Sequence, residues 1–168
     1  MKNKQLTHQQ VNFKNSSKLQ IFVFLDKIDS PANLGSIFRN AEAFDVDTIW
    51  LRNENKKDLD SNRFKRTSRS TEKNLNIEYY KDFQTVFDDF KGLMIGLEIT
   101  SNSENIVNIN QTVNDKVLVV LGNEKFGIQK TILQRLDKVY HIEMYGNNSS
   151  MNVSQTLGIT LHELRRRV

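Results

Sequence analysis

Short, uninterrupted apolar runs recur along this chain, and stretches with helical periodicity separate them. The two most apolar runs are IFVFL at residues 21–25 and VLVVL at residues 117–121. Neither run alternates with polar residues, which is typical of strands that are buried on both faces of a sheet. Strands that alternate with helices predict an α/β domain with a mainly parallel sheet flanked by helices.

The rest of the pattern places further strands and three helices along the chain. Strand-forming segments predict strands at residues 48–51, 77–80, 93–97 and 139–144. The sequence DSP at residues 29–31 is typical of a helix start, because proline is tolerated in a first turn. Apolar residues at helical spacing indicate two more helices, at residues 82–91 and 152–167.

One domain accounts for the length of the chain, since 168 residues can bury a sizeable core. Residues 1–18 are polar and carry four lysines, so we expect a basic N-terminal arm there, mobile or helical, and a single domain at residues 19–168. The net charge is +4. This mild positive charge fits a nucleic-acid partner but does not establish one.

Several classes of protein are excluded by composition. The chain has no cysteine, so a disulfide scaffold, an iron–sulfur site and a cysteine nucleophile are ruled out. Its apolar runs are too short to span a bilayer, and the segment MKNKQLTHQQ lacks the apolar region of a signal peptide. His8, His141 and His162 have no metal-ligand spacing. We therefore expect a cytoplasmic protein without a metal site or a membrane partner.

The first polar segment, DSPANLGSIFRNAEAF at residues 29–44, follows the first predicted strand. We expect Asn33 and Gly35 at the turn from strand to helix, and Arg39 on the helix. A guanidinium near a helix start suits recognition of a phosphate or a carboxylate. An ordinary surface arginine is the alternative.

The second segment, LGNEKFGI at residues 121–128, follows the most apolar strand, where α/β folds collect their ligands. Gly122 and Gly127 would allow the backbone to approach a ligand closely, although glycines required only by loop geometry are equally compatible. The segment is not a nucleotide-binding P-loop, because Ile128 and Gln129 stand where that motif requires Lys and Ser or Thr.

The third segment, MYGNNSSMNVSQTLGITLHE at residues 144–163, is a polar loop that runs into the last predicted helix. Helix capping requires only one of its many amide and hydroxyl side chains. The excess indicates ligand contacts, with a flexible asparagine-rich loop as the alternative. The polar residues before the helix are Asn148, Ser149, Ser150, Asn152 and Ser154.

In this order and spacing, the three segments resemble the motifs of the SpoU/TrmH family, in the SPOUT superfamily of RNA ribose methyltransferases. NLGSIFRNAEAF at 33–44 matches N-x-G-x-I-x-R-x-A-x-A-F, and GNEKFG at 122–127 matches G-x-E-x-x-G. IEMYG at 142–146 and SMNVS at 150–154 match I-P-M-x-G and S-L-N-V-S. The resemblance covers residues 19–167, which is nearly the whole chain.

This resemblance implies a fold that periodicity alone does not predict. Family members have an α/β sheet whose C-terminal segment forms a deep trefoil knot, although knots are very rare among proteins. The resemblance likewise implies a homodimer assembled through the knot region. In that case Val153, Leu157 and Leu161 would be either dimer contacts or part of the core.

The resemblance also implies an activity, the transfer of a methyl group from S-adenosylmethionine (SAM) to a ribose 2′-hydroxyl. Arg39 matches the proposed base of the family. Because a guanidinium is effectively never deprotonated, we expect Arg39 instead to bind a phosphate and polarise the hydroxyl. We expect Glu124 to orient the catalytic groups. The implied catalytic residues are Asn33, Arg39, Glu124, Ser150 and Asn152, and the implied cofactor-binding residues are Leu121, Gly122, Ile142, Met144 and Met151.

Three residues depart from the family pattern. Asn40 and Asp45 stand where the family favours Thr and Gly, and Glu143 replaces the usual Pro of I-P-M. The last substitution is expected to place a carboxylate beside the cofactor site, where it would either point to solvent or weaken SAM binding.

Two residues favour a tRNA substrate. Lys125 in G-x-E-K-x-G, and Arg166 after Glu163, resemble the branch that methylates the D-loop guanosine 18 of tRNA. Ribosomal RNA is the alternative substrate, and a non-catalytic RNA-binding module or a nucleotide-binding regulator is the alternative function. RNA is expected to bind through the catalytic domain itself. The candidate contacts are Arg63, Lys65, Arg66, Arg69, Lys73, Arg166 and the neighbouring Arg165 and Arg167, together with the basic arm.

Overall fold

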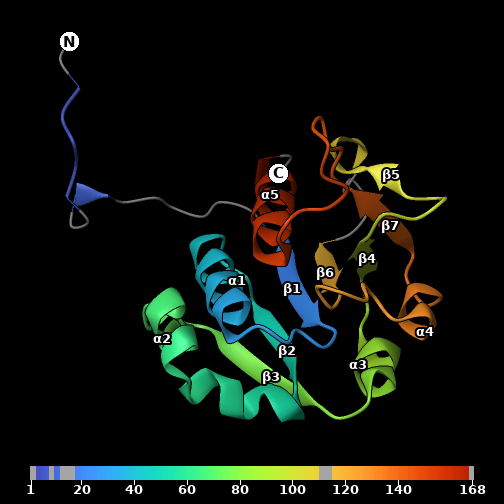
Figure 1. Ribbon diagram of the computed structural model, residues 1–168, viewed down its shortest axis with the longest axis horizontal. Coiled ribbons are helices and arrows are strands. Elements are labelled where there is room, and N and C mark those ends of the chain that lie inside the picture. The colour runs from blue at the N-terminus through green and yellow to red at the C-terminus, as the bar shows by residue number, and fades with distance from the viewer. Residues whose placement is uncertain (1–2, 8–9, 12–17, 110–114, 167–168) are drawn as a thin grey trace.

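The computed structural model of the chain describes residues 3–7, 10–11, 18–109 and 115–166 (Figure 1). Its centre is a seven-stranded sheet with the order β3-β2-β1-β6-β4-β7-β5. Every pairing in that sheet is parallel, which confirms the predicted sheet. The strands are β1 (Gln20–Leu25), β2 (Thr48–Arg52), β3 (Asn76–Tyr80), β4 (Leu93–Leu97), β5 (Glu104–Asn105), β6 (Lys116–Leu121) and β7 (Lys138–His141).

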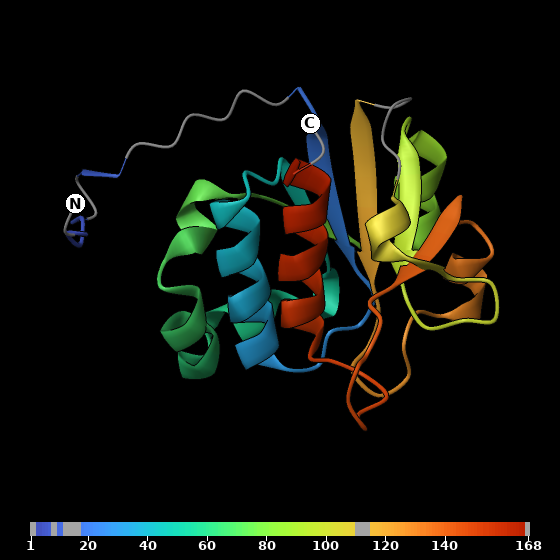
Figure 2. The ribbon, with the colours of Figure 1, turned by 90° about the horizontal axis from the view of Figure 1, so that it is seen from above.

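Helices cover both faces of the sheet (Figure 2). One face carries α1 (Pro31–Ala43), α2 (Asn62–Ser68) and α5 (Val153–Arg166). The other face carries α3 (Phe83–Asp89) and α4 (Lys130–Leu133). Short 3-10 segments are η2 (Asn53–Asp60), η3 (Thr71–Asn74) and η4 (Ile106–Asn108). No described helix is both long and apolar enough to cross a membrane.

Two apolar cores explain why the central strands have uninterrupted apolar sequences. Side chains alternate along a strand, so β1 contributes Ile21 and Val23 to the core under α1 and α5, and Phe24 to the core under α3. The ring of Phe24 stacks on Tyr80 and meets Phe87 edge to face, with centroid distances of 4.4 and 5.1 Å. Both faces of the strand are therefore buried.

The boundary of α1 agrees with its predicted start. The Ser30 side chain caps the helix by accepting the Asn33 N–H at 3.3 Å, and Pro31 follows in the first turn. Gly35, expected at the turn, lies instead inside the helix. A Cβ on Gly35 would lie 2.7 Å from the Phe64 carbonyl oxygen and 2.9 Å from the Ser68 nitrogen. The missing side chain therefore allows α2 to pack closely against α1.

The last predicted strand is shorter than expected. It ends at His141, because residues 142–152 leave the sheet and lead to α5, which packs against α1. Strand β5 and helix α4 are too short to show a periodic pattern and were not predicted. The described part of the N-terminal arm, residues 3–7 and 10–11, contains no α-helix. His8 and Arg167 lie outside the described residues.

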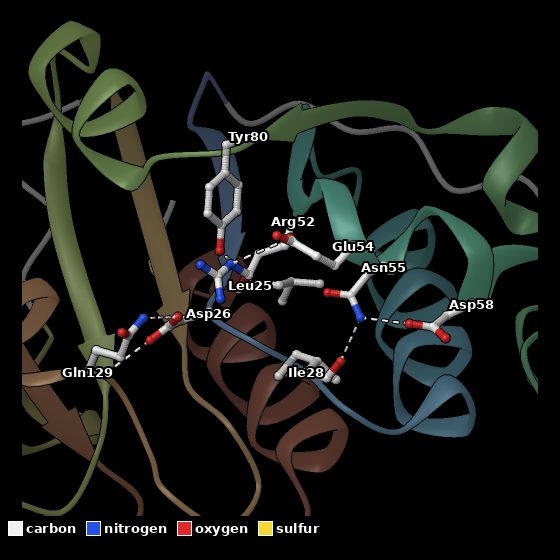
Figure 3. Close-up of polar contacts among 9 residues, drawn as sticks. All are labelled: Leu25, Asp26, Ile28, Arg52, Glu54, Asn55, Asp58, Tyr80 and Gln129. Atoms are coloured by element: carbon white, nitrogen blue, oxygen red, sulfur yellow. Dashed lines mark hydrogen bonds and ion pairs between the residues drawn. The ribbon is translucent and has the colours of Figure 1, made fainter.

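A buried polar cluster closes the carboxyl ends of β1, β2 and β3 (Figure 3). The Tyr80 hydroxyl donates to the Leu25 carbonyl at 2.7 Å. The buried carboxylate of Asp26 accepts the backbone N–H of Gln129 at 3.0 Å and its side-chain amide at 2.6 Å. Asn55 donates to the Ile28 carbonyl at 2.9 Å. These bonds hold the segment between β1 and α1 in one conformation.

Stability above pH 10 is expected to depend on Tyr80. Burial, helped by the charge of Asp26, raises the pKa of Tyr80 far above its usual value of 10.0. A tyrosine in the unfolded chain ionises as the pH rises through that value, whereas Tyr80 in the folded chain does not. Ionisation therefore favours the unfolded state, and this contribution to stability is lost at high pH.

A Tyr80→Phe variant tests this effect. At neutral pH it is expected to lose about 1 kcal/mol of unfolding free energy, because the Leu25 carbonyl loses its donor. Its stability should then fall less steeply than that of the wild type between about pH 9 and pH 11. Urea unfolding across that range measures both slopes. Equal slopes would show that the Tyr80 hydroxyl ionises in the folded protein.

Candidate active site and cofactor cavity

A chain of hydrogen bonds joins the three polar segments of the sequence. The Glu124 carboxylate accepts the backbone N–H groups of Asp29 and Ser30 at 3.2 and 3.3 Å, and the Asn33 amide at 2.8 Å. The Asn33 side-chain oxygen in turn accepts the Asn152 amide at 3.0 Å. The segments after β1, after β6 and before α5 therefore meet at one place, although they are far apart in sequence.

Asn123 is a second link that sequence reasoning missed. Its amide donates to the Lys27 carbonyl at 2.7 Å and to the Asp29 carboxylate at 2.8 Å. Its side-chain oxygen accepts the N–H groups of Lys125 and Phe126 at 3.0 and 3.1 Å. An asparagine that begins a tight loop often bonds to the backbone two residues on, and this local signal could have identified it.

Glu98 is another residue of the site that the sequence did not indicate. It follows β4 directly, and its carboxylate accepts the backbone N–H of Ile128 at 3.0 Å. A Cβ on Gly127, which has a φ of +68°, would overlap that carboxylate. A Cβ on Gly122 would overlap the Gly127 backbone. Both glycines are thus required by closure of the loop itself, in agreement with the loop-geometry alternative.

Two adjoining cavities lie at the carboxyl ends of β4 and β6. The larger has a volume of about 760 Å³, the smaller about 110 Å³, and they share a wall formed by residues 97–99, Ser150, Met151 and Thr156. The larger is lined by Asn33, Glu124, Asn152, Leu121 and Gly122, and the smaller by Ile142 and Met144. Every predicted catalytic or cofactor residue except Arg39 therefore lines one of the two cavities.

Arg39 lies in a cleft of about 810 Å³ between α1, α2 and α5, which it shares with Arg66 and Arg69. None of these three guanidinium groups forms an ion pair with a described residue. Met151 lines both this cleft and the larger cavity, so the two spaces adjoin. The arrangement presents three unpaired positive charges next to the cavity.

Arg69 enters the cleft on an unusual turn. It ends α2 with a φ of +53°, and Ser70 follows with a φ of +67°. Such backbone conformations are costly for residues other than glycine and cluster at functional sites. The close approach of α2 to α1 at Gly35 completes the arrangement, because it places α2 and its arginines beside Arg39.

The other basic residues predicted to bind RNA are not brought into this cleft. Arg63 and Lys65 do not line it, and Lys65 lies 4.0 Å from Asp60. Arg166 pairs with Glu163 at 2.7 Å. Arg165 is a structural residue, because its guanidinium donates to the carbonyls of residues 19, 44 and 45 at 2.6–2.9 Å.

The departures from the family pattern also have structural reasons. Asn40 donates to the Ser154 carbonyl at 2.6 Å and thereby ties α1 to α5. Asp45 has a φ of +52°, a conformation that glycine adopts most easily and that Asp tolerates. Glu143 accepts the Asn105 amide at 2.9 Å, is exposed and lines neither cavity, which favours the alternative that its carboxylate points to solvent.

His141 lines the smaller cavity, beside Ile142 and Met144. His141 Nδ1 lies 3.0 Å from the Ser103 hydroxyl. Among the described residues, no group of three His, Asp or Glu side chains is arranged to hold a metal ion.

A Glu124→Gln substitution tests the hydrogen-bonded chain. Both carboxylate oxygens accept N–H donors, so an amide would turn one acceptor into a donor facing a donor. We expect kcat for the methyl transfer that the motif resemblance implies to fall about tenfold, with a change in unfolding free energy of about 1 kcal/mol or less, because Glu124 is exposed. Glu143→Gln is the matched control, since its carboxylate lies outside both cavities. Equal activities of the two variants would contradict the role of Glu124.

Comparison with known proteins places the chain among RNA methyltransferases. The sequence profile of the SpoU rRNA Methylase family matches residues 20–162. A Dictyostelium discoideum protein, "rRNA methyltransferase 1, mitochondrial", is 29% identical over 158 residues, which cover 89% of this chain and 29% of the relative. The Saccharomyces cerevisiae tRNA (guanosine(18)-2′-O)-methyltransferase is 26% identical over 156 residues, which cover 87% of this chain and 10% of the relative. This chain thus spans less than a third of the length of either relative.

The fold agrees with these sequence matches. The crystal structure of an AdoMet-bound rRNA methyltransferase from Sinorhizobium meliloti matches with a TM-score of 0.80 and 24% identity. The match covers 89% of this chain and 57% of that one. The knotted SPOUT fold that the motifs implied is accordingly the fold of this chain. With the profile matching almost the whole domain, this chain belongs to the SpoU rRNA Methylase family.

Proposed function

We propose that this chain transfers a methyl group from SAM to a ribose 2′-hydroxyl of structured RNA. The observation that carries the proposal is the position of the three-arginine cleft. It adjoins, at Met151, the cavity that contains the hydrogen-bonded chain Glu124–Asn33–Asn152. A site for an anionic substrate and a site for a small cofactor thus share a border. The family and the printed names of the relatives support the same activity.

The residues of the cavity fit SAM. Its volume lies in the range of small-molecule sites, and Leu121, Met151 and Ile142 provide apolar walls for an adenosyl group. The acidic Glu98 and Glu124 border the same space, which suits a ligand with a cationic sulfonium and an ammonium group. Leu121, Gly122, Ile142, Met144 and Met151 would hold the cofactor. When bound, SAM supplies an electrophilic methyl group.

The chain's own residues would align the hydroxyl and stabilise its developing charge. Arg39 would bind a phosphate and polarise the 2′-oxygen, so that this oxygen is prepared to accept the methyl group that SAM would supply. The hydroxyl proton passes to water or to an RNA phosphate, because the guanidinium keeps its own protons. Glu124 acts through Asn33 and through the loop of residues 29–30, and it therefore positions the reacting groups. Ser150 and Asn152 border the same space.

We propose tRNA, and within it the D-loop guanosine 18, as the substrate. Lys125, which favours that branch of the family, lines the larger cavity, and the Saccharomyces relative is named for that nucleotide. Ribosomal RNA is the second candidate, supported by the printed names of the family and of the Dictyostelium relative. Arg66 and Arg69 provide the RNA contacts nearest to Arg39. The roles of Arg63, Lys65 and Arg166 in binding RNA remain predictions.

Labelled SAM tests both proposals in one experiment. Total RNA from cells that lack this gene is incubated with the protein, separated into tRNA and rRNA, and mapped to the nucleotide. Label at a D-loop ribose of tRNA is the expected result. Label in rRNA would keep the activity and overturn the substrate. With folded protein and intact RNA, no label in either fraction would overturn the activity and favour a non-catalytic binding module.

Four further expectations stay proposals. Leu157 and Leu161 are fully buried in the core, which supports the core alternative for these two residues, whereas Val153 is only partly buried. A homodimer through α5 would instead use Ile159, which is 37% exposed in the cleft beside Arg39. The basic arm at residues 1–18, the single domain at 19–168 and a cytoplasmic location also remain predictions.

A further inference from the structure

Phe126 is a large aromatic residue that the proposed reaction does not use. Its side chain is 78% exposed, and it stands between Glu124 and Gly127 in the loop after β6. It lines the same cavity of about 760 Å³ as Asn33, Glu124 and Asn152. An apolar ring is therefore presented to solvent at the rim of the candidate active site.

The backbone holds this ring in its exposed position. Asn123 and Gly127 exchange backbone hydrogen bonds at 3.1 and 2.9 Å, and the Asn123 side chain accepts the Phe126 N–H at 3.1 Å. Glu98 accepts the N–H of the next residue after the loop, Ile128, at 3.0 Å. These bonds fix the backbone of the loop and therefore the point from which the Phe126 side chain projects. The exposure is thus a property of the folded loop.

A positive charge accompanies the ring. The Lys125 ammonium nitrogen lies 5.2 Å from the centroid of the Phe126 ring. An aromatic face next to a cation matches the two parts of a nucleotide, because a base stacks on the ring and the phosphate interacts with the charge. The cleft that contains Arg39, Arg66 and Arg69 adjoins the same cavity at Met151 and adds further positive charge.

We propose that Phe126 is a stacking platform for a nucleobase of the substrate RNA, at or beside the nucleotide that is methylated. This inference rests on the proposed function. RNA is recognised largely through unstacked bases that pack on aromatic side chains, and a single such contact contributes substantially to affinity. Stacking of this kind accepts every base, so Phe126 contributes affinity and position, whereas base identity is read elsewhere.

Phe126→Ala and Phe126→Leu separate stacking from simple apolar contact. We measure the affinity of each full-length variant for the tRNA and rRNA fractions of cells that lack the gene, and separately for SAM. The alanine variant is expected to bind the substrate fraction about tenfold more weakly than the wild type, because stacking on one base is lost. Leucine should restore only part of this loss, since it has no π face. Affinity for SAM and thermal stability should stay unchanged.

Tyr79→Ala is the matched control. Tyr79 is 37% exposed on β3, has the Lys56 ammonium 4.3 Å from its ring centroid, and lines neither the cavity nor the cleft. Tyr79 therefore also pairs an exposed aromatic ring with a lysine ammonium group, but away from the cavity and the cleft. Its alanine variant should bind RNA like the wild type. An equal loss in both alanine variants would overturn the inference. A loss of SAM affinity in Phe126→Ala would also overturn it and would assign the ring to the cofactor.

Phe126→Trp provides a direct signal. The new indole should be quenched when RNA is added, beyond the change that Trp50 shows in the wild type, because a base that stacks on it quenches its emission. No additional quenching would overturn the inference. If the wild type methylates RNA while all Phe126 variants bind RNA like the wild type, only this inference fails. If the wild type neither binds nor methylates RNA, the proposed function fails with it.

Discussion

Replacing Arg39 by alanine is expected to lower kcat for methyl transfer about 100- to 1,000-fold, which is the usual cost of removing one preorganised group that stabilises a transition state. Arg39 is exposed, lies in the cleft with two other arginines, and forms no ion pair with a described residue. Its removal therefore takes away an exposed charge of the cleft and should leave the packing of α1 unchanged. SAM affinity should also stay unchanged, because Arg39 does not line either of the two cofactor cavities.

Two further variants make the result specific. Arg39→Lys keeps the charge but loses the planar, five-donor geometry of the guanidinium, so only part of the activity should return. Arg135→Ala removes an exposed arginine that lies outside the cleft and both cavities, and it should leave kcat unchanged. Single-turnover methyl transfer and calorimetric binding of SAM separate chemistry from cofactor binding. Full activity of Arg39→Ala would refute its catalytic assignment.

Gly35→Ala is expected to destabilise the protein by about 2 kcal/mol or more, as overpacking of a close contact does. A Cβ at this position would overlap the Thr67 side chain and lie within 3 Å of backbone atoms of Phe64 and Ser68. Backbone atoms cannot rotate away, so α2 would have to move from α1. Alanine has the higher helix propensity by about 1 kcal/mol, which acts in the opposite direction. A net loss of unfolding free energy therefore reports the cost of overpacking the contact between α1 and α2.

The same substitution should weaken RNA binding, because α2 carries Arg66 and Arg69 into the cleft of Arg39. Gly146→Ala is the control for stability, since a Cβ there would meet nothing within 4 Å and the position does not have a positive φ. Urea unfolding of both variants gives the free energies, and a salt titration of RNA binding reports the phosphate contacts. A Gly35→Ala protein as stable as the wild type would show that α2 accommodates the methyl group without cost.

Much of the fold was predictable because its signals are local. Local sequence predicts three features that the structure confirms. These are the strands at the apolar runs of β1 and β6, and the start of α1 at Ser30-Pro31. Strand β5 has two residues and helix α4 has four, which is too few for a periodic pattern. The predicted end of β7 was wrong for a different reason. Ile142 continues an apolar pattern but belongs to the segment that leaves the sheet.

In the candidate site, too, some residues could be predicted from the sequence and others could not. The motifs named Asn33, Glu124 and Asn152, and the structure joins these residues by hydrogen bonds. No pattern in the sequence separates Arg66 and Arg69, which line the cleft, from Arg63 and Lys65, which do not. The difference depends on how closely α2 approaches α1 and on the left-handed turn at Arg69.

The sequence by itself determined six of the seven strands, helices α1, α3 and α5, and the family, because short-range periodicity and motif spacing are encoded within neighbouring residues. Only the tertiary structure decided what each polar residue does. Gly35 lets two helices touch, Glu143 is held away from the cavity, and Phe126 is held in solvent beside it. These outcomes depend on contacts between residues far apart in the chain. Such contacts exist only after the parallel strands have set which loops meet at the carboxyl edge of the sheet.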